Sequence, residues 1–302
     1  MVARVALPET LAEARPHLFA RVAGAVAVSL QQRTLAAQGA FDAAEETVPV
    51  VVDYALGAVL DLPDADVPVS ASLLSRWGVG FEAVLAVAEE RRAQLEASID
   101  RVGTAHVISG VPFAAAVLRD PAAVQQLRPG GTPVIVIPDA GTVVLGFAEE
   151  PESLQWVAKA AEHVLAGSSR WVSAEPLVRA GGAWEPFVWP AEAAADVARL
   201  NRRRDSVQYG AARQALQPAF EDEGVAVAEL VLAEREGAYS TYATLVEGVE
   251  SVVPRVDELV LASADGRVTR VPFDEVAAVP GLLEPVEGVT PAYSRVRAFP
   301  AL

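Results

Sequence analysis

The sequence predicts an α+β fold, with a mixed sheet and helices in the N-terminal part and a mainly antiparallel sheet in the C-terminal part. Two observations carry this prediction. Apolar residues at helical spacing alternate with short β-branched runs as far as residue 220, and after Gly224 strand-like runs dominate. We therefore expect an α+β domain over 1–189, a connecting helix over 190–220, and a mainly β domain with an extended tail over 221–302.

The N-terminal segment predicts helices followed by one buried strand. From Glu9 to Gln38 the spacing of Ala, Leu and Val is helical, with a break at Pro16. From Val48 to Leu62 the chain is β-branched and almost continuously apolar. Such a run is typical of a strand that is buried on both faces.

The central segment alternates helices with hairpins. Pro151 and Gly167 bound one helix at both ends, because proline suits the first helical turn and glycine the end. The expected elements are an amphipathic helix over 81–99, a strand over 105–108, a helix over 113–127 that is interrupted near Pro121, a hairpin of 134–137 with 142–147, the helix over 151–167, and a hairpin of 177–179 with 184–187.

The C-terminal segment predicts strands and a tail. Asp265-Gly266 is a hairpin signal between two of the strands. The proline-rich end over 279–302 predicts an extended tail laid over the fold. The expected strands cover 225–233, 239–246, 259–262 and 268–271.

The charge of the chain restricts the classes of partner. The 40 acidic and 24 basic residues give a net charge of -16 and an isoelectric point near 4.6. Nucleic acids and anionic membranes are bound through basic surfaces, so we expect neither as a partner. The acidic surplus fits a basic protein partner, and it fits a solubilising surface as well.

Cysteine usage and hydropathy indicate the compartment. The chain has no cysteine, which excludes disulfide bonds, thiol nucleophiles and cysteine zinc sites. Its first residues lack the apolar run and cleavage site of a secretory signal, and no uninterrupted apolar stretch reaches about 18 residues. We therefore expect a cytoplasmic protein without a membrane span.

Sequence motifs for catalysis or cofactor binding are missing. The glycines at 130–131 lack the GK[ST] ending of a phosphate loop, and no GxSxG elbow surrounds a serine. His17, His106 and His163 lie in separate expected elements, and the single lysine, Lys159, lies on the polar side of its helix. We expect no cofactor and favour a non-catalytic protein over an enzyme.

Two polar clusters suggest ligand chemistry. Carboxylates at a strand end offer oxygen ligands to a hard cation, although aspartates in such turns more often bond to their own backbone. A run of arginines can hold a phosphate or carboxylate, although a solvated helix surface is the more common role. The weak metal candidates are Asp61, Asp64 and Asp66. The candidate anion contact consists of Arg202, Arg203 and Arg204.

Bulky aromatic residues gather in one short region of a chain that is only 6% aromatic. They are Trp171, Trp184, Phe187 and Trp189. Tryptophan and its neighbours on a surface often anchor a protein partner, so this region is the candidate interaction surface. Closing the edge of the core is the alternative role.

Several short motifs resemble one family of proteins. They are LDLPD at 60–64, LSRWGV at 74–79, VIVIPD at 134–139 with TVVLG at 142–146, and, in a C-terminal extension, STY at 240–242 and YSRVRAFP at 293–300. In these motifs the chain resembles the uncharacterised bacterial family typified by Bacillus YtpQ. It departs from the family's polar segments at 111–116 and 139–141. The resemblance implies the α+β fold and carries over no activity.

Charge and the missing motifs together favour a non-catalytic interaction or regulatory protein. Its acidic surface would attract a basic partner, and the aromatic residues would anchor that partner. One alternative is a hydrolase or metal-assisted enzyme that uses Asp61, Asp64 or Asp66 with a distant histidine such as His106. The other alternative is a small-ligand-binding module, which requires a concave pocket.

Overall fold

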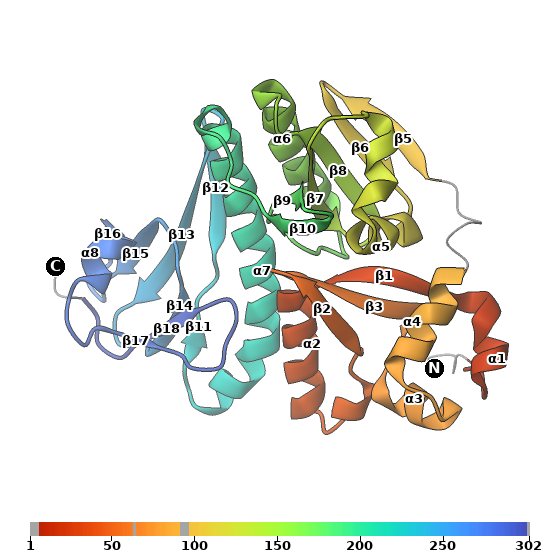
Figure 1. Cartoon of the computed structure of the whole chain (residues 1–302). Coiled ribbons are helices and arrows are strands. Elements are labelled where there is room, and N and C mark those ends of the chain that lie inside the picture. The colour runs from red at the N-terminus through yellow and green to blue at the C-terminus, as the bar shows by residue number, and fades with distance from the viewer. Residues whose placement is uncertain (1–5, 63–64, 91–96, 301–302) are drawn as a thin grey trace. The chain divides into compact units, whose positions relative to one another are not determined.

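The α+β fold is confirmed by the computed structural model, which describes residues 6–62, 65–90 and 97–300 (Figure 1). The chain forms two compact units, Met1–Leu200 and Asn201–Leu302. Helix α7 (Ala194–Asp222) begins in the first unit and continues in the second.

The first unit contains two antiparallel sheets and most of the described helices. Its helices are α1 (Leu11–Ala14), α2 (Ala25–Ala37), α3 (Ala71–Trp77), α4 (Phe81–Glu90), α5 (Val111–Arg119) and α6 (Pro151–Gly167), with short 3-10 turns η1 (Arg15–His17), η2 (Phe41–Ala43), η4 (Pro121–Leu127) and η5 (Ala191–Ala193). Its strands are β1 (Leu18–Gly24), β2 (Thr47–Val51), β3 (Tyr54–Leu62), β4 (Ala65–Pro68), β5 (Ser98–Val102), β6 (Ala105–Ser109), β7 (Pro133–Asp139), β8 (Thr142–Phe147), β9 (Leu177–Ala180) and β10 (Ala183–Pro186).

The smaller sheet of this unit has the strand order β1-β3-β2, and β4 also pairs with β3. Strand β3 is buried from Tyr54 to Leu60 on both faces, as its apolar run predicts. Helices α4 and α5 pack against β1. The Tyr54 hydroxyl donates to the Glu175 carbonyl oxygen at 2.5 Å and accepts from the Ile137 N–H at 3.2 Å, which ties this sheet to the second one.

The larger sheet has the strand order β10-β9-β7-β8-β6-β5, and α6 packs on β7 and β8 (Figure 1). A side chain at Gly146 of β8 would meet Val157 at 2.7 Å and Ser153 at 2.8 Å, so glycine is what lets the helix lie this close. The two predicted hairpins and the helix over 151–167 are confirmed here.

Three sequence predictions in the first unit are wrong. The predicted helical region from Glu9 to Gln38 contains strand β1, because seven cross-strand pairs with β3 outweigh its local helical spacing. The predicted single strand over 48–62 is the hairpin of β2 and β3, whose turn includes Val52 at a φ of 46°. The predicted helix over 81–99 ends at Glu90, residues 91–96 lie outside the described residues, and Ile99 belongs to β5.

The second unit consists of two four-stranded sheets and the rest of α7. The sheet orders are β11-β14-β18-β17 and β12-β13-β15-β16. The strands are β11 (Ala226–Val227), β12 (Val231–Arg235), β13 (Ala238–Val246), β14 (Ser251–Pro254), β15 (Glu258–Ala262), β16 (Val268–Pro272), β17 (Leu283–Pro285) and β18 (Tyr293–Val296), and α8 (Phe273–Ala277) follows β16.

Strand direction and the C-terminal tail differ from expectation. The two parallel pairs, β11 with β14 and β13 with β15, lie in the second unit, and the described pairs of the first unit are all antiparallel. The second unit is mainly antiparallel, as predicted, but the parallel pairs lie there and not in the first unit, because strand direction depends on how strands are connected and not on local pattern. The predicted extended tail includes strand β18, which is part of a sheet. Its Tyr293 is buried, and the Tyr293 hydroxyl donates to the Tyr209 carbonyl oxygen at 3.2 Å.

Candidate functional site

The predicted aromatic surface does not exist as one patch. Trp184 on β10 is only 7% exposed, belongs to the core of the first unit, and donates from Nε1 to the Val117 carbonyl oxygen at 2.8 Å. Its inclusion in an exposed surface is therefore wrong, because its burial satisfies both the ring and the N–H group. Phe187 and Trp189 are half-buried and meet edge to face at 6.2 Å. Trp171 lines a different hollow together with Arg21.

A groove of about 440 Å³ lies in the first unit and is lined by residues of β2 and β10, which contact each other. Each of these strands is the edge of its sheet. Strand β3, helices α4 and α5 and the turn before β10 supply the rest of the lining. The lining residues are Val48, Pro49, Val50, Val51, Leu56, Glu82, Leu85, Leu118, Arg119, Gly182, Ala183 and Trp184. Most of these residues are apolar, but polar and apolar atoms contribute about equally to the exposed lining, so the groove is amphipathic.

Val50 lies at the centre of the β2 wall. The register with β3 shifts between Pro49 and Val51, so Val50 sits in a bulge. Its side chain is 41% exposed although it is large and apolar. The sequence did carry a signal for this place, because a proline within a strand run indicates an edge strand. The apolar run alone had indicated a strand buried on both faces.

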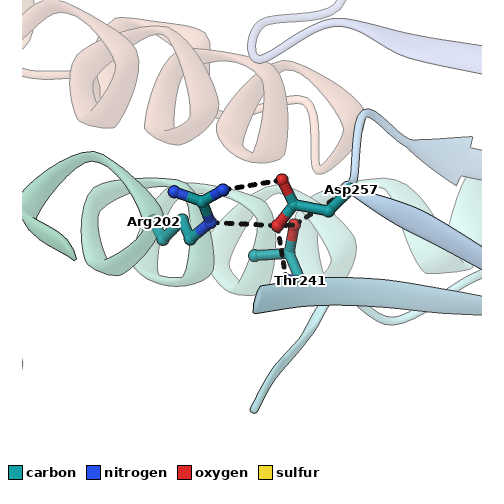
Figure 2. A network of polar contacts seen from close by, with 3 residues as sticks. All are labelled: Arg202, Thr241 and Asp257. Carbon is teal, nitrogen blue, oxygen red and sulfur yellow. Dashed lines mark hydrogen bonds and ion pairs between the residues drawn. The ribbon is translucent and has the colours of Figure 1, made fainter. Parts of the chain in front are cut away.

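The three consecutive arginines are engaged within the second unit. Arg202 forms two bonds to Asp257, from Nε to Oδ2 at 3.0 Å and from Nη2 to Oδ1 at 2.9 Å (Figure 2). Arg203 donates to the Tyr239 hydroxyl at 2.8 Å, and Arg204 pairs with Asp205 at 3.0 Å. Side chains of the same unit thus provide acceptors for all three arginines, and an anion contact here stays a prediction.

Thr241 completes the network around Asp257 (Figure 2). Its backbone N–H and its hydroxyl both donate to Asp257 Oδ2, at 2.7 and 2.9 Å. Burial acts to raise the pKa of Asp257, but the hydrogen bonds from Arg202 and Thr241 outweigh it and hold the pKa below its ordinary value. This network stabilises the packing of α7 on β13 and the start of β15. The Asp257 carboxylate accepts four hydrogen bonds in it.

Of the three predicted metal candidates, the structure describes Asp61 and Asp66. Asp61 and Asp66 face each other across β3 and β4, and both are exposed. Asp66 pairs with Arg170 at 3.6 Å. Asp64 lies outside the described residues. Among the residues that the structure describes, no three His, Asp or Glu side chains are grouped to hold a metal ion.

The histidines stay apart, as their positions in sequence suggest. His17 Nδ1 lies 3.2 Å from the Asp61 carbonyl oxygen, and His163 is exposed on α6. His106 on β6 packs against the edge of Phe147, with ring centres 6.4 Å apart. Burial, together with the charge of Arg101, lowers the pKa of His106. None of these contacts pairs a histidine with a nucleophile.

Comparisons with family models, with curated proteins and with solved structures each find no match. The resemblance to the YtpQ-typified family therefore stays a prediction. Within the described residues, no single helix combines the length and apolar character of a membrane span, and only the bent pair of α3 and α4 does so jointly. The cytoplasmic location also stays a prediction.

Proposed function

We propose that this protein is a non-catalytic interaction module, and that its partner places an extended apolar segment in the groove between β2 and β10. The observation that supports the proposal is a groove that is bordered by two sheet edges and lined mostly by apolar residues. An edge strand offers backbone N–H and C=O groups to an added strand, and an adjoining apolar surface accepts every second side chain of that strand.

The groove lining supports a peptide more than a small polar ligand. Leu56, Leu85 and Leu118 come from three different elements and line the groove together with the buried Trp184, which gives it an aliphatic part. Such a part selects aliphatic side chains through burial of apolar area. Backbone pairing along the β2 edge then sets the direction and register of the bound segment.

Charge supports a partner with basic residues beside the apolar segment. The chain carries a net charge of -16, and Glu82 lies at the groove itself. Arg119 also lines the groove, but it forms an ion pair with Glu89. Complementary charge speeds association and makes it sensitive to salt. We therefore expect lysine or arginine on at least one side of the bound segment.

The enzyme alternative has less support. It requires a histidine close to the carboxylates at the end of β3, whereas His17 meets only the backbone of Asp61 and His106 lies on a different sheet. A positioned acid or base must lie within hydrogen-bond reach of the group on which it acts. No described contact provides such a pair here.

A synthetic peptide tests the proposal directly. The probe is an extended peptide of alternating valine and threonine with two lysines at each end, labelled for fluorescence anisotropy. Val50→Glu places a charge in the groove, and Val268→Glu is the matched control because Val268 is also an exposed strand valine, at 63%, in the second unit. We expect the full-length wild type and Val268→Glu to bind alike, and Val50→Glu to bind about tenfold more weakly or worse.

A second peptide with glutamates in place of the lysines tests the charge argument. It should bind more weakly than the first peptide, and the difference should shrink as salt is added. Equal binding of the lysine peptide to the wild type and Val50→Glu would reject the groove. Equal binding of both peptides at low salt would reject the basic partner.

A further inference from the structure

A second cavity, of about 280 Å³, lies in the first unit at the end of β1 and beside the first turns of α2. Arg21 and Glu45 form part of its wall, and the segment of Arg170 and Trp171 forms another part. None of these residues lines the groove between β2 and β10. The two hollows are therefore independent sites.

The ion pair of Arg21 and Glu45 gives the cavity its charge. Arg21 Nε donates to Glu45 Oε1 at 2.7 Å, and Arg21 Nη2 bonds to Oε2. The Glu45 side chain is only 2% exposed, whereas that of Arg21 is 20% exposed. Both carboxylate oxygens are thus occupied and shielded, and the charged atoms that this pair leaves to a ligand are N–H donors of the guanidinium.

Two glycines allow this arrangement. Gly57 is the cross-strand partner of Arg21, and a Cβ at that position would overlap Glu45 Oε1. Gly24, at the end of β1, lies so close to the Val172 carbonyl oxygen that a Cβ would overlap it too. The absence of a side chain at Gly57 therefore leaves room for the buried Glu45 carboxylate, and its absence at Gly24 lets the Val172 backbone come close.

The opposite wall adds a second cation and a large apolar ring. Arg170 is 47% exposed, and its contact with Asp66, at 3.6 Å, is longer than a direct hydrogen bond. Trp171 contributes a half-buried indole, and small apolar residues such as Val22 and Val28 line the cavity together with the polar Gln31 and Ser169. The cavity thus combines two guanidinium groups with an aromatic and aliphatic surface.

We propose that this cavity binds a small organic carboxylate. The carboxylate would accept hydrogen bonds from Arg21 and Arg170, since guanidinium groups present donors in the planar geometry that a carboxylate matches. The body of the ligand would lie against Trp171 and the aliphatic wall. The volume is near the lower limit for ligand pockets, which selects small molecules.

The probe for this site is benzoate, which has one carboxylate and one flat apolar ring. Benzamide has the same shape without the charge, and inorganic phosphate has charge without an apolar body. Binding is measured on the full-length protein by calorimetry and by the indole N–H resonance of Trp171, assigned through Trp171→Phe. We expect benzoate to bind and to shift that resonance, with benzamide at least about tenfold weaker.

Variants then locate the carboxylate. Arg170→Gln should weaken benzoate binding several-fold, and Arg101→Gln, an exposed arginine on β5, should leave it unchanged. The double variant Arg21→Met/Glu45→Met replaces a buried ion pair by apolar groups, a change that proteins often tolerate, and it should abolish binding. Val50→Glu should bind benzoate normally, which separates this site from the groove.

The proposal is overturned if benzoate causes no heat and no shift, or if benzamide or phosphate binds as well as benzoate does. It is also overturned if Arg170→Gln binds benzoate with wild-type affinity. Because Arg170 is largely exposed, that variant is expected to fold even if the double variant does not.

Discussion

Each unit of this protein contains an arginine bound to a carboxylate through two hydrogen bonds, and the two pairs have different surroundings. Arg202 and Asp257 lie at the surface, with side chains 32% and 37% exposed, and Thr241 donates two further bonds to the carboxylate. In the pair of Arg21 and Glu45 the carboxylate is buried and the guanidinium borders a cavity. The same chemistry therefore serves as a cross-link in one unit and as a cavity wall in the other.

The difference shows that an arginine run in a sequence is a poor guide to ligand binding. The conspicuous arginines at 202–204 are occupied by acceptors of their own unit. The isolated Arg21, within an apolar strand, lines a cavity instead. What matters is whether donors remain exposed to a concave surface, and this depends on the surrounding elements.

Removing one partner of the buried pair should produce the largest effect. Arg21→Ala leaves Glu45 buried without its donor, so we expect the free energy of unfolding to fall by about 3–5 kcal/mol. The double variant Arg21→Met/Glu45→Met should recover most of this loss. Urea denaturation of the wild type and both variants measures it. A double variant as unstable as Arg21→Ala would show that the pair itself, and not the uncompensated charge, stabilises the unit.

Filling the space at Gly57 should disturb the same pair less severely. A methyl group there overlaps Glu45 Oε1, so Gly57→Ala should cost about 1–3 kcal/mol and also weaken benzoate binding. Gly210→Ala is the matched control, because Gly210 lies within α7 with no atom within 4 Å of an added Cβ. That control should gain about 0.5–1 kcal/mol through helix propensity. Equal effects of the two changes would contradict the close packing at Gly57.

Breaking the surface pair should have the smallest effect. Asp257→Asn removes the charge that Arg202 and Thr241 bind, and we expect a loss of about 1–2 kcal/mol at neutral pH. Benzoate binding should not change, since the residue lies in the second unit. Urea denaturation and calorimetry together distinguish this cross-link from the cavity pair.

The cost of Asp257→Asn should depend on pH. The folded pKa of Asp257 lies below its ordinary value of 3.8, so the unfolded state binds the proton more readily. The stabilisation is then complete above that ordinary value and is lost as the pH falls through the folded pKa. The stability difference between the wild type and Asp257→Asn should therefore shrink in strong acid. A difference that stays constant down to that range would contradict the lowered pKa.

Local signals predicted much of the fold but little of the candidate sites. The helix over 151–167 was predicted with both ends because Pro151 and Gly167 mark them locally. The groove was not predicted, since it requires β2 and β10 to come together from positions far apart in sequence. Two roles were open for Trp184, a surface anchor or a residue that closes the edge of the core, because composition alone does not show which faces of a hairpin are covered; the structure places it in the core.

The sequence by itself determined the α+β class, the turns, the hairpins and the acidic character, because each depends on neighbouring residues or on simple counts. Only the tertiary structure decided that β1 is a strand, that Asp257 accepts hydrogen bonds from Arg202, and that Arg21 and Glu45 form an ion pair beside a cavity. Those outcomes follow from long-range pairing and burial, which set the partner of each polar group after distant segments have packed together.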